Sequence, residues 1–584
     1  MIRKAVIDLG SNSVRIVIFE IGKSGAQREL DNIKQMVRLN EYVDKKGRIR
    51  EEGVLQTIHV LKQFVKLAEL YRVNEIIGVA TYVIRAAKNK EEILKRIKKE
   101  TGLSFRLLSG EDEAYLGYLA VIHTLRVKDA LIFDMGGGST ELTLVKRREM
   151  VATHSIPYGA LTMRRVLKHD PPSEKDVRRA LETLYSLFAG IDWVHRLNIP
   201  VIGIGGTVRS IAKLVQAEKQ YPLRLLHGFQ MDSSDITWIF ERIRRMRLSE
   251  RQALEGLSRD RADLVVGGAL LIRTLLEVSD GSTLIISDHG LRDGVMFESR
   301  ERERLVPLPK DPLDTSIESM IEGLDLNREH AHVTWTLLER LLTLLKSYHL
   351  LSPKKSDKRL LRAAALLHDA GHIISHHNAS DHTFYVLLHA PLFALTHRER
   401  LLVAAIAGYK NPRQLALLLY PYQWLLEEED ESWIKTAGLL LRLVRVLDRG
   451  QTGDVRSLQL IRDDGKPGER AYPERSEKDS DIQDPADGDD AIGGFEEDAS
   501  SLPIHGLESP QTITSYTASG MVPPSYTLVI EVTRSPLIIR DDLEDVVRRL
   551  GKRLKIRLNW LIQTIDTHVV SEDEQRTKED PPNS

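Results

Sequence analysis

The 584-residue chain has no cysteine and carries almost no net charge. The absence of cysteine excludes disulfides, thiolate nucleophiles and thiolate-bound metals, and it fits a reducing compartment. A formal net charge of −1 provides no overall basic field for nucleic acid, so a polyanionic substrate would have to be held by local groups. No apolar run reaches the length of a membrane span. These absences predict a cytoplasmic protein with neither a membrane nor a nucleic-acid partner.

The length of the chain is too great for one hydrophobic core and predicts about four domains. Strands alternate with helices throughout the first 300 residues, which indicates α/β lobes. Long amphipathic helices follow, at residues 317–348, 360–368 and 398–409, and indicate an all-α domain. An acidic stretch with few large apolar residues then predicts a disordered insertion, because it cannot bury enough surface to offset its ordering entropy. The predicted divisions are two α/β lobes at 1–125 and 126–305, a helical domain at 312–462, the insertion at 463–524, a strand–helix segment at 525–565 and a polar tail at 566–584.

Three apolar strands end in small-residue turns that could hold phosphate. Glycine lets the backbone approach an anion closely, and the turn N–H groups and hydroxyls can donate hydrogen bonds to phosphate oxygens. Asp8 and Asp134, which precede two of the turns, could orient a hydrated divalent cation. Each turn alone is compatible with an ordinary structural role, and Thr207 also with a helix N-cap, but three in order favour one cleft. The candidate phosphate ligands are Gly10, Ser11, Asn12, Ser13 and Arg15; Gly136, Gly137, Gly138, Ser139 and Thr140; and Gly205, Gly206 and Thr207.

This arrangement resembles the superfamily of actin, hexokinase and the heat-shock chaperone ATPases (ASKHA), whose two ribonuclease H-like lobes present phosphate loops to a cleft. The detailed motifs resemble the exopolyphosphatase / guanosine pentaphosphate phosphohydrolase (Ppx/GppA) family, strongly over residues 1 to about 300. The resemblance implies an α/β fold of two actin-like lobes, followed by a helical domain and a small α+β segment. The motifs that carry it are DLGSNSVR (8–15), ATYVIR (80–85), SGEDEA (109–114), DMGGGSTEL (134–142), GIGGT (203–207), DRAD (260–263) and SDHGLRDG (287–294).

The resemblance also assigns roles within the cleft. It implies that Glu113 activates the attacking water and that Asp134 and Glu141 help to hold magnesium, while Arg85 can offer a guanidinium fork to phosphate oxygens. Spacing alone would favour a dipole-stabilised position of Glu113 at a helix N-terminus, but the surrounding SGEDEA motif favours the base. Glu111 is the competing base, and Asp112 is a weaker candidate.

Seven of the nineteen histidines fall between His368 and His397. The segment LLHDAGH (366–372) resembles the signature of HD-type metal-dependent phosphohydrolases. That resemblance implies a second divalent-metal site at His330 (or His332), His368, Asp369 and Asp448, with His382 as an additional candidate ligand. Lys410 stands where a related domain would have histidine. A complete metal centre is therefore less expected than a domain that shapes the cleft entrance and binds a long substrate or a regulatory nucleotide.

Together with the phosphate-binding turns, the family resemblance implies an exopolyphosphatase that releases orthophosphate from inorganic polyphosphate by magnesium-assisted attack of water. The alternatives are a guanosine pentaphosphate 5′-phosphohydrolase and a non-catalytic polyphosphate or alarmone (guanosine pentaphosphate/tetraphosphate) sensor. A kinase of the same superfold and chemistry at the HD-like residues also remain open. The basic run 242–251 is either a polyphosphate channel or a solvated face, and a homodimer is expected.

Overall fold

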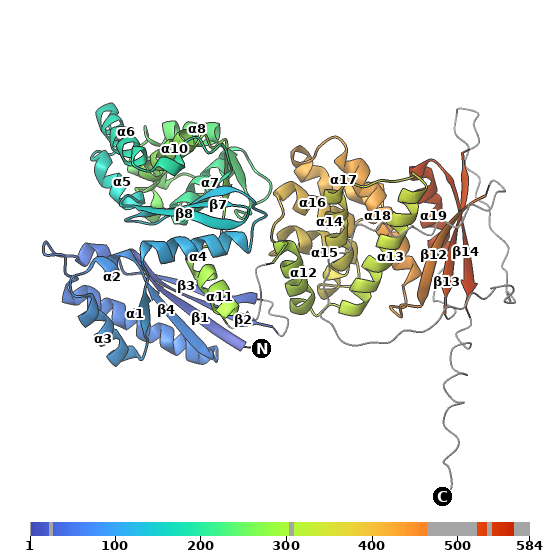
Figure 1. Ribbon diagram of the computed structural model, residues 1–584, viewed down its shortest axis with the longest axis horizontal. Coiled ribbons are helices and arrows are strands. Elements are labelled where there is room, and N and C mark those ends of the chain that lie inside the picture. The colour runs from blue at the N-terminus through green and yellow to red at the C-terminus, as the bar shows by residue number, and fades with distance from the viewer. Residues whose placement is uncertain (1, 23–26, 303–308, 464–522, 534–539, 566–584) are drawn as a thin grey trace, which may run out of the picture. The chain divides into compact units, whose positions relative to one another are not determined.

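The computed structural model describes residues 2–22, 27–302, 309–463, 523–533 and 540–565 (Figure 1). Residue contacts divide the chain into two compact units. The first comprises Met1–Leu326, Asp369–Ala404 and Leu417–Glu427, and the second comprises Asn327–His368, Ala405–Ala416 and the chain from Glu428 on. The predicted acidic insertion lies almost entirely, and the polar tail entirely, outside the described residues.

The first lobe is built on a five-stranded sheet with the order β3-β2-β1-β4-β5. Strand β1 pairs antiparallel with β2 and parallel with β4. Because side chains alternate across a strand, Ala5, Ile7 and Leu9 enter one hydrophobic cluster while Val6 enters another on the opposite face. The elements are β1 (Ile2–Leu9), β2 (Ser13–Ile21), β3 (Gln27–Met36), α1 (Glu51–Leu70), β4 (Glu75–Ala80), α2 (Tyr82–Ala86), α3 (Lys90–Thr101) and β5 (Phe105–Leu107).

The second lobe repeats this arrangement in a six-stranded sheet with the order β10-β11-β9-β6-β7-β8. Strand β6 pairs antiparallel with β7 and parallel with β9, as β1 does with β2 and β4. The predicted pair of related actin-like α/β lobes is therefore confirmed. The strands are β6 (Ala130–Met135), β7 (Thr140–Lys146), β8 (Glu149–Ile156), β9 (Val201–Ile204), β10 (Gln230–Asp232) and β11 (Thr283–Ile286). The helices are α5 (Ala160–Leu167), α6 (Glu174–Ala189), α7 (Gly206–Glu218), α8 (Ser233–Ile243), α9 (Leu248–Gln252) and α10 (Val265–Ser279).

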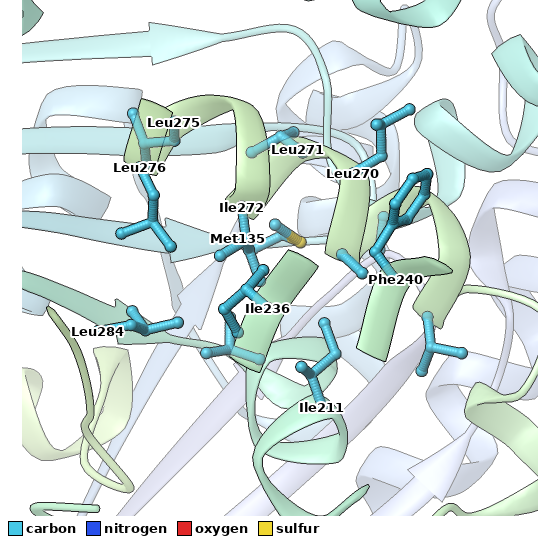
Figure 2. Close-up of a cluster of buried hydrophobic side chains, with 14 of the residues drawn as sticks. Met135, Ile211, Ile236, Phe240, Leu270, Leu271, Ile272, Leu275, Leu276 and Leu284 are labelled. Carbon is cyan, nitrogen blue, oxygen red and sulfur yellow. The ribbon is translucent and has the colours of Figure 1, made fainter. Parts of the chain in front are cut away.

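Helix α10 forms the centre of the second lobe's core. Its apolar side chains pack with Met135 of β6, Ile236 and Phe240 of α8, and Leu284 of β11 (Figure 2). They are Leu270, Leu271, Ile272, Leu275 and Leu276. A helix that is apolar around most of its circumference must be buried on most of its faces. This core provides the rigid support on which the ends of β6 and β9 are fixed.

Two helices, α4 (Gly110–Ile122) and α11 (Leu291–Arg302), lie between the sheets of the two lobes (Figure 1). Helix α4 contacts β6, β7 and β8, whereas α11 contacts α4 and β1. The crossing is so close that a Cβ atom at Gly294 would lie 2.0 Å from the carbonyl oxygen of Leu116. Glycine is therefore required at this position for steric reasons.

The remaining chain is helical up to a three-stranded sheet with the order β12-β13-β14. Its elements are α12 (Pro312–Gly323), α13 (Arg328–Ser347), α14 (Lys355–Leu366), α15 (Ala379–His389), α16 (His397–Ala407), α17 (Pro412–Leu419), α18 (Asp430–Leu447), β12 (Val455–Arg462), β13 (Ser525–Val532), α19 (Arg540–Leu554) and β14 (Arg557–Thr564). Among the described residues, no helix combines the length and the apolar character needed to cross a membrane.

Two sequence expectations are wrong in this region. The single helix expected at 317–348 is broken after Gly323, because Asp325 adopts a left-handed conformation and Asn327 caps α13 by accepting a hydrogen bond from His330 N at 3.1 Å. The region expected to be wholly helical ends in strand β12, which pairs with β13 more than sixty residues later in the chain. Local periodicity does not reveal so distant a partner.

Candidate active site

Two hairpin turns, one in each lobe, have the same backbone arrangement. Gly10 N donates to Ser13 O at 3.1 Å, and Gly136 N donates to Ser139 O at 3.0 Å. The strand registers are also equivalent, since Asp8 lies opposite Arg15 and Asp134 lies opposite Glu141. The two lobes therefore offer the same turn to a ligand but differ in charge, with a guanidinium in one where the other has a carboxylate.

A third turn follows β9 and packs against the second. Gly205 has φ 115°, and a Cβ atom there would lie 2.5 Å from Met135 O, so both conformation and space require glycine. Gly205 is also the N-cap residue of α7, which directs the first N–H groups of that helix toward the turn. The alternative interpretation of Thr207 as the N-cap is wrong, because Thr207 is a buried residue inside α7.

The three turns line one cleft of about 460 Å³ in the first unit. Most of the candidate site residues lie on its lining: Gly10, Ser11, Asn12, Ser13, Arg15, Glu113, Asp134, Gly136, Gly137, Gly138, Ser139, Glu141, Gly205 and Gly206. Three candidates lie off this lining, namely Arg85, Thr140 and Thr207. The Thr140 hydroxyl donates to Tyr158 O at 2.7 Å, and this bond directs it away from a phosphate.

Helix α4 positions Glu113 on the cleft. Ser109 and Asp112 form a reciprocal capping box at the start of the helix, which fixes its first turn. Glu113 lies in the same first turn, is buried, and accepts a hydrogen bond from Arg85. Burial and the negative charge of Glu141 raise the pKa of Glu113 to about 8, against the opposing effect of Arg85. The guanidinium thus compensates a carboxylate that would otherwise be costly to ionise.

The structure separates Glu113 from the two competing bases. Glu111 is exposed and lies off the cleft lining. The carboxylate of Asp112 accepts from Ser109 in the capping box and from Arg106 at 2.7 Å, which occupies it at the helix end. Of the three carboxylates in this first turn, only Glu113 faces the cleft.

Asp134 and Glu141 form a second group of carboxylates beside Glu113. Burial raises the pKa of Asp134 to about 6, and burial together with the charge of Asp134 raises the pKa of Glu141 to about 7. Ser139 and Ser155 donate to the same oxygen of Glu141, at 2.7 and 3.1 Å, and hold it in place. Crowded buried carboxylates and hydroxyls are the oxygen-rich donor set that a hard divalent cation prefers. The residues present therefore fit a hard divalent cation, the class of ion to which magnesium belongs.

Basic side chains that the sequence analysis did not single out surround the cleft. Arg292 donates to Asp8 at 2.9 Å, and Arg209 donates to the side chain of Asp288 at 2.9 Å. The pKa of Arg15 is lowered to about 10 by burial and by the positive charges of Arg292 and Arg209. The other basic lining residues are Lys34, Arg38, Arg164, Arg259 and Arg261. Arg261 and Arg292 stand in family-like motifs, whereas only the folded topology brings Lys34 and Arg209 to the cleft.

Arginines of the basic run 242–251 form ion pairs within the second lobe. Arg242 pairs with Glu218, and Arg244 pairs with Glu174 at 2.8 Å. Arg251 is almost completely buried and donates to Asp170 at 2.6 Å. These pairs favour a structural role for the three arginines over a polyphosphate channel.

The histidine cluster of the second unit contains three of the residues expected from the HD resemblance. His330 Nδ1 lies 2.9 Å from Asp448 Oδ2, and the rings of His330 and His368 meet edge to face with centroids 5.2 Å apart. All three side chains are buried, whereas the alternative His332 is exposed. Asp369 belongs to the first unit, where its carboxylate lies 3.4 Å from His372 Nδ1.

Comparison with known proteins gives a consistent assignment. The Ppx/GppA phosphatase family model matches residues 17–303, and the model of domain III of the same phosphatases matches residues 314–466. Exopolyphosphatase 1 of Mycobacterium tuberculosis (strain H37Rv) is 29% identical over 307 residues, which cover 52% of this chain and 89% of that protein. The bifunctional 3-dehydroquinate synthase/phosphatase of Fusobacterium nucleatum is 26% identical over 313 residues, which cover 51% of this chain and 47% of that protein.

Solved structures of similar proteins include the Ppx/GppA family member of Aquifex aeolicus, at 32% identity and a TM-score of 0.47, with 52% of this chain and 98% of that chain covered. An exopolyphosphatase from Cytophaga hutchinsonii has 25% identity and a TM-score of 0.47, with 53% of this chain and all of that chain covered. The two family models together match well over half of the residues. The chain is therefore a hydrolase that belongs to the Ppx/GppA phosphatase family.

Proposed function

We propose that the chain hydrolyses the terminal phosphoanhydride bonds of inorganic polyphosphate and releases orthophosphate. The observation that carries this proposal is Glu113, a buried carboxylate on the lining of a cleft that is otherwise made of N–H-rich turns and basic side chains. Similarity to proteins named exopolyphosphatases supports the substrate class. Phosphoryl transfer to water needs charge neutralisation, alignment and a base for the water, and the cleft offers groups for each.

The turns at 10–13, 136–139 and 205–206 bind the terminal phosphates through backbone N–H groups. Arg15 of the first lobe, Arg209 of α7 in the second lobe and Arg292 of α11 neutralise the phosphate oxygens. Asp134 and Glu141 would hold magnesium, which supplies additional charge neutralisation on the phosphate oxygens when bound. Every group in this assignment lines the same cleft.

Glu113 acts as the base. Its carboxylate takes a proton from the attacking water as the water oxygen bonds to the terminal phosphorus, and the phosphoanhydride P–O bond breaks. The shortened chain leaves with the electron pair of that bond on its terminal oxygen. Arg85 is a positioning residue rather than a phosphate ligand, because it donates to Glu113 and to Leu108 O at 2.5 Å. It holds the carboxylate toward the cleft and favours its ionised form.

The test is orthophosphate release by the purified full chain with magnesium, from polyphosphate of several lengths and, separately, from guanosine pentaphosphate. We expect release from polyphosphate, and a fall in kcat of about 10²- to 10⁴-fold in Glu113→Gln with substrate binding retained. The matched control is Glu111→Gln, which changes an exposed carboxylate in the same helical turn and leaves kcat unchanged.

Other outcomes of these assays would support a different function or a different site. Release from guanosine pentaphosphate alone identifies the phosphohydrolase alternative. Tight polyphosphate binding without turnover identifies a sensor, and transfer of phosphate from ATP to an added acceptor identifies a kinase. Full turnover in Glu113→Gln contradicts the assignment of Glu113 as the base. If turnover were instead lost in Asp369→Ala, the reaction would be assigned to the HD-like residues.

We also propose that the histidine cluster of the second unit binds a divalent metal, through His330, His368 and Asp448. Buried imidazoles beside a carboxylate are suitable ligands for a first-row ion. Metal analysis of the purified protein tests this proposal, since His330→Gln should lower the bound metal while Glu113→Gln should not. Equal metal content in wild type and His330→Gln would contradict it.

A further inference from the structure

A second cavity, of about 630 Å³, lies in the first unit. Its lining combines apolar and aromatic side chains from β2, from His123 directly after α4, from α11 and α12, and from α15 and the segment after it. His123 and Phe297 stack with their ring centroids 4.3 Å apart and an interplanar angle of 8°. The other aromatic and large apolar lining residues are Phe19, Met320, Leu324, Val386, Pro391 and Phe393. A cavity of this size and character is typical of sites for small organic ligands.

Arg300 of α11 also lines the cavity and is buried, with 3% of its surface exposed. Its Nε and Nη2 atoms have no hydrogen-bond partner among the residues that the structure describes. Burial lowers its pKa, and no charge in the described part of the chain contributes to the shift. A guanidinium without a counter-charge is costly to bury, and an anion at this position would remove the cost.

Several other charged groups of the lining, unlike the two nitrogens of Arg300, have hydrogen-bond partners. Glu20 accepts from Arg3 at 3.0 Å and from Arg28 at 2.9 Å. His289 Nδ1 lies 3.0 Å from Asp293 Oδ1. Glu29 accepts from Asn32 at 3.2 Å, and Glu322 closely approaches Gly22. None of these carboxylates contributes to the pKa of Arg300, so the guanidinium remains the natural contact for an incoming anion.

We propose that this cavity binds a small organic anion with an aromatic or apolar body. A carboxylate or phosphate group of the ligand pairs with Arg300, and its body packs on the His123–Phe297 stack and the apolar side chains opposite. An inorganic phosphate chain does not fit this description, because most of the lining is apolar. The substrate of the cleft and the ligand of the cavity are therefore of different chemical classes.

The cavity shares one short turn with the cleft. His289 and Asp293 line the cavity, whereas Gly290, Leu291 and Arg292 line the cleft. Arg292 in turn donates to Asp8 beside the first phosphate turn. A ligand that shifts this turn also shifts Arg292, so the cavity is an effector site. This part of the inference rests on the proposed function of the cleft, while ligand binding itself does not.

Binding is tested with two fluorescent probes of similar shape, 8-anilino-1-naphthalenesulfonate and the uncharged N-phenyl-1-naphthylamine. Orthophosphate is added in excess to occupy the cleft. We expect one saturable site in the wild type that prefers the anionic probe by about tenfold or more, since a charge-assisted pair replaces an unpaired cation. Arg300→Met keeps the side-chain bulk and removes the charge, so it should abolish the preference while the neutral probe still binds.

Absence of a saturable site, or equal anion preference in wild type and Arg300→Met, overturns the proposal. If circular dichroism shows that Arg300→Met is unfolded, Ser319→Phe decides, because it retains Arg300 but fills the cavity from α12. Undiminished probe binding in that variant is then the contrary result. The effector role is tested separately: the anionic probe should change kcat/KM for orthophosphate release in wild type and not in Arg300→Met. Probe binding without such a change removes the coupling alone, and absence of any release is a failure of the proposed function.

Discussion

At the scale of single residues, the pairing of Arg85 with Glu113 has the clearest chemical consequence. Two effects, burial and the charge of Glu141, favour the protonated carboxyl, while Arg85 favours the ionised form that a base requires. Arg85 is therefore expected to act on the pH dependence of catalysis more than on phosphate affinity. A guanidinium that bound phosphate directly would instead act on phosphate affinity more than on the pH dependence of catalysis.

The corresponding prediction concerns Arg85→Ala. Removal of the positive charge raises the pKa of Glu113, so the ascending limb of the kcat–pH profile should move to higher pH and kcat at neutral pH should fall by about tenfold or more. KM for polyphosphate should change little. The measurement is the pH profile of kcat for wild type and Arg85→Ala, with Arg85→Lys as a partial rescue. A large rise in KM with an unmoved profile would make Arg85 a phosphate ligand.

The histidine at the start of α11 gives a second residue-scale prediction, for stability. Although burial lowers the pKa of His289, the charge and hydrogen bond of Asp293 outweigh this effect and raise it above the ordinary value. Although burial raises the pKa of Asp293, the charge and hydrogen bond of His289 help to lower it to about 2. A histidine whose pKa is raised by folding contributes its full stabilisation below about pH 6.5, which is its pKa in the unfolded state. This stabilisation is lost as the pH rises through the pKa of the folded state.

We therefore expect His289→Gln to destabilise the protein clearly at pH 5.5 and much less at pH 9, as measured by urea unfolding at both pH values. The groups that face His289 are Asp293, Asp288, Glu29 and the ring of His227. Exposed His377→Gln is the control and should have no pH-dependent effect. A cost for His289→Gln that is the same at both pH values would show that its packing, and not its charge, stabilises the fold.

At the scale of elements, the contact between α4 and α11 joins Glu113, the proposed base, to the first turn of α11, which carries Arg292. Gly294 allows the two helices to approach to backbone contact, since a Cβ there would lie 2.0 Å from Leu116 O. The position of Glu113 in the cleft therefore depends on a residue that has no side chain.

Gly294→Ala should lower the free energy of unfolding by about 2 kcal/mol or more, because the methyl group meets backbone that cannot move aside cheaply. It should also lower kcat, since α4 must shift. The matched control is Gly323→Ala, which is likewise in a helix but has no atom within 4 Å of the added Cβ. Differential scanning calorimetry of both variants gives the comparison, and equal melting temperatures would contradict the steric argument.

The elements also show how far the sequence leads. The strand–turn motifs predicted the three turns of the cleft, because each is encoded by a contiguous run of apolar and then small residues. The break before α13 was missed because Asp325 and Asn327 act through backbone conformation and capping. Lys34 and Arg209 could not be assigned to the cleft, since only the pairing of β2 with β3 and the placement of α7 bring them there. Arg85 was expected at phosphate and is found against Glu113.

At the scale of the whole molecule, the expected homodimer is a simple prediction. Light scattering coupled to size-exclusion chromatography should give twice the 66.2 kDa mass of the chain. The value should persist on dilution into the low-micromolar range, as expected for an extensive symmetric interface. A mass equal to one chain would establish a monomer.

The turn that serves both cavities restricts how the protein can change through evolution. A substitution at His289 or Asp293 that improved the fit of a cavity ligand would also move Arg292, so selection on the reaction would oppose it. Met320 of α12, by contrast, lines the cavity but is not part of the cleft lining. A substitution at Met320 can therefore reshape the cavity without a direct effect on the residues that line the cleft.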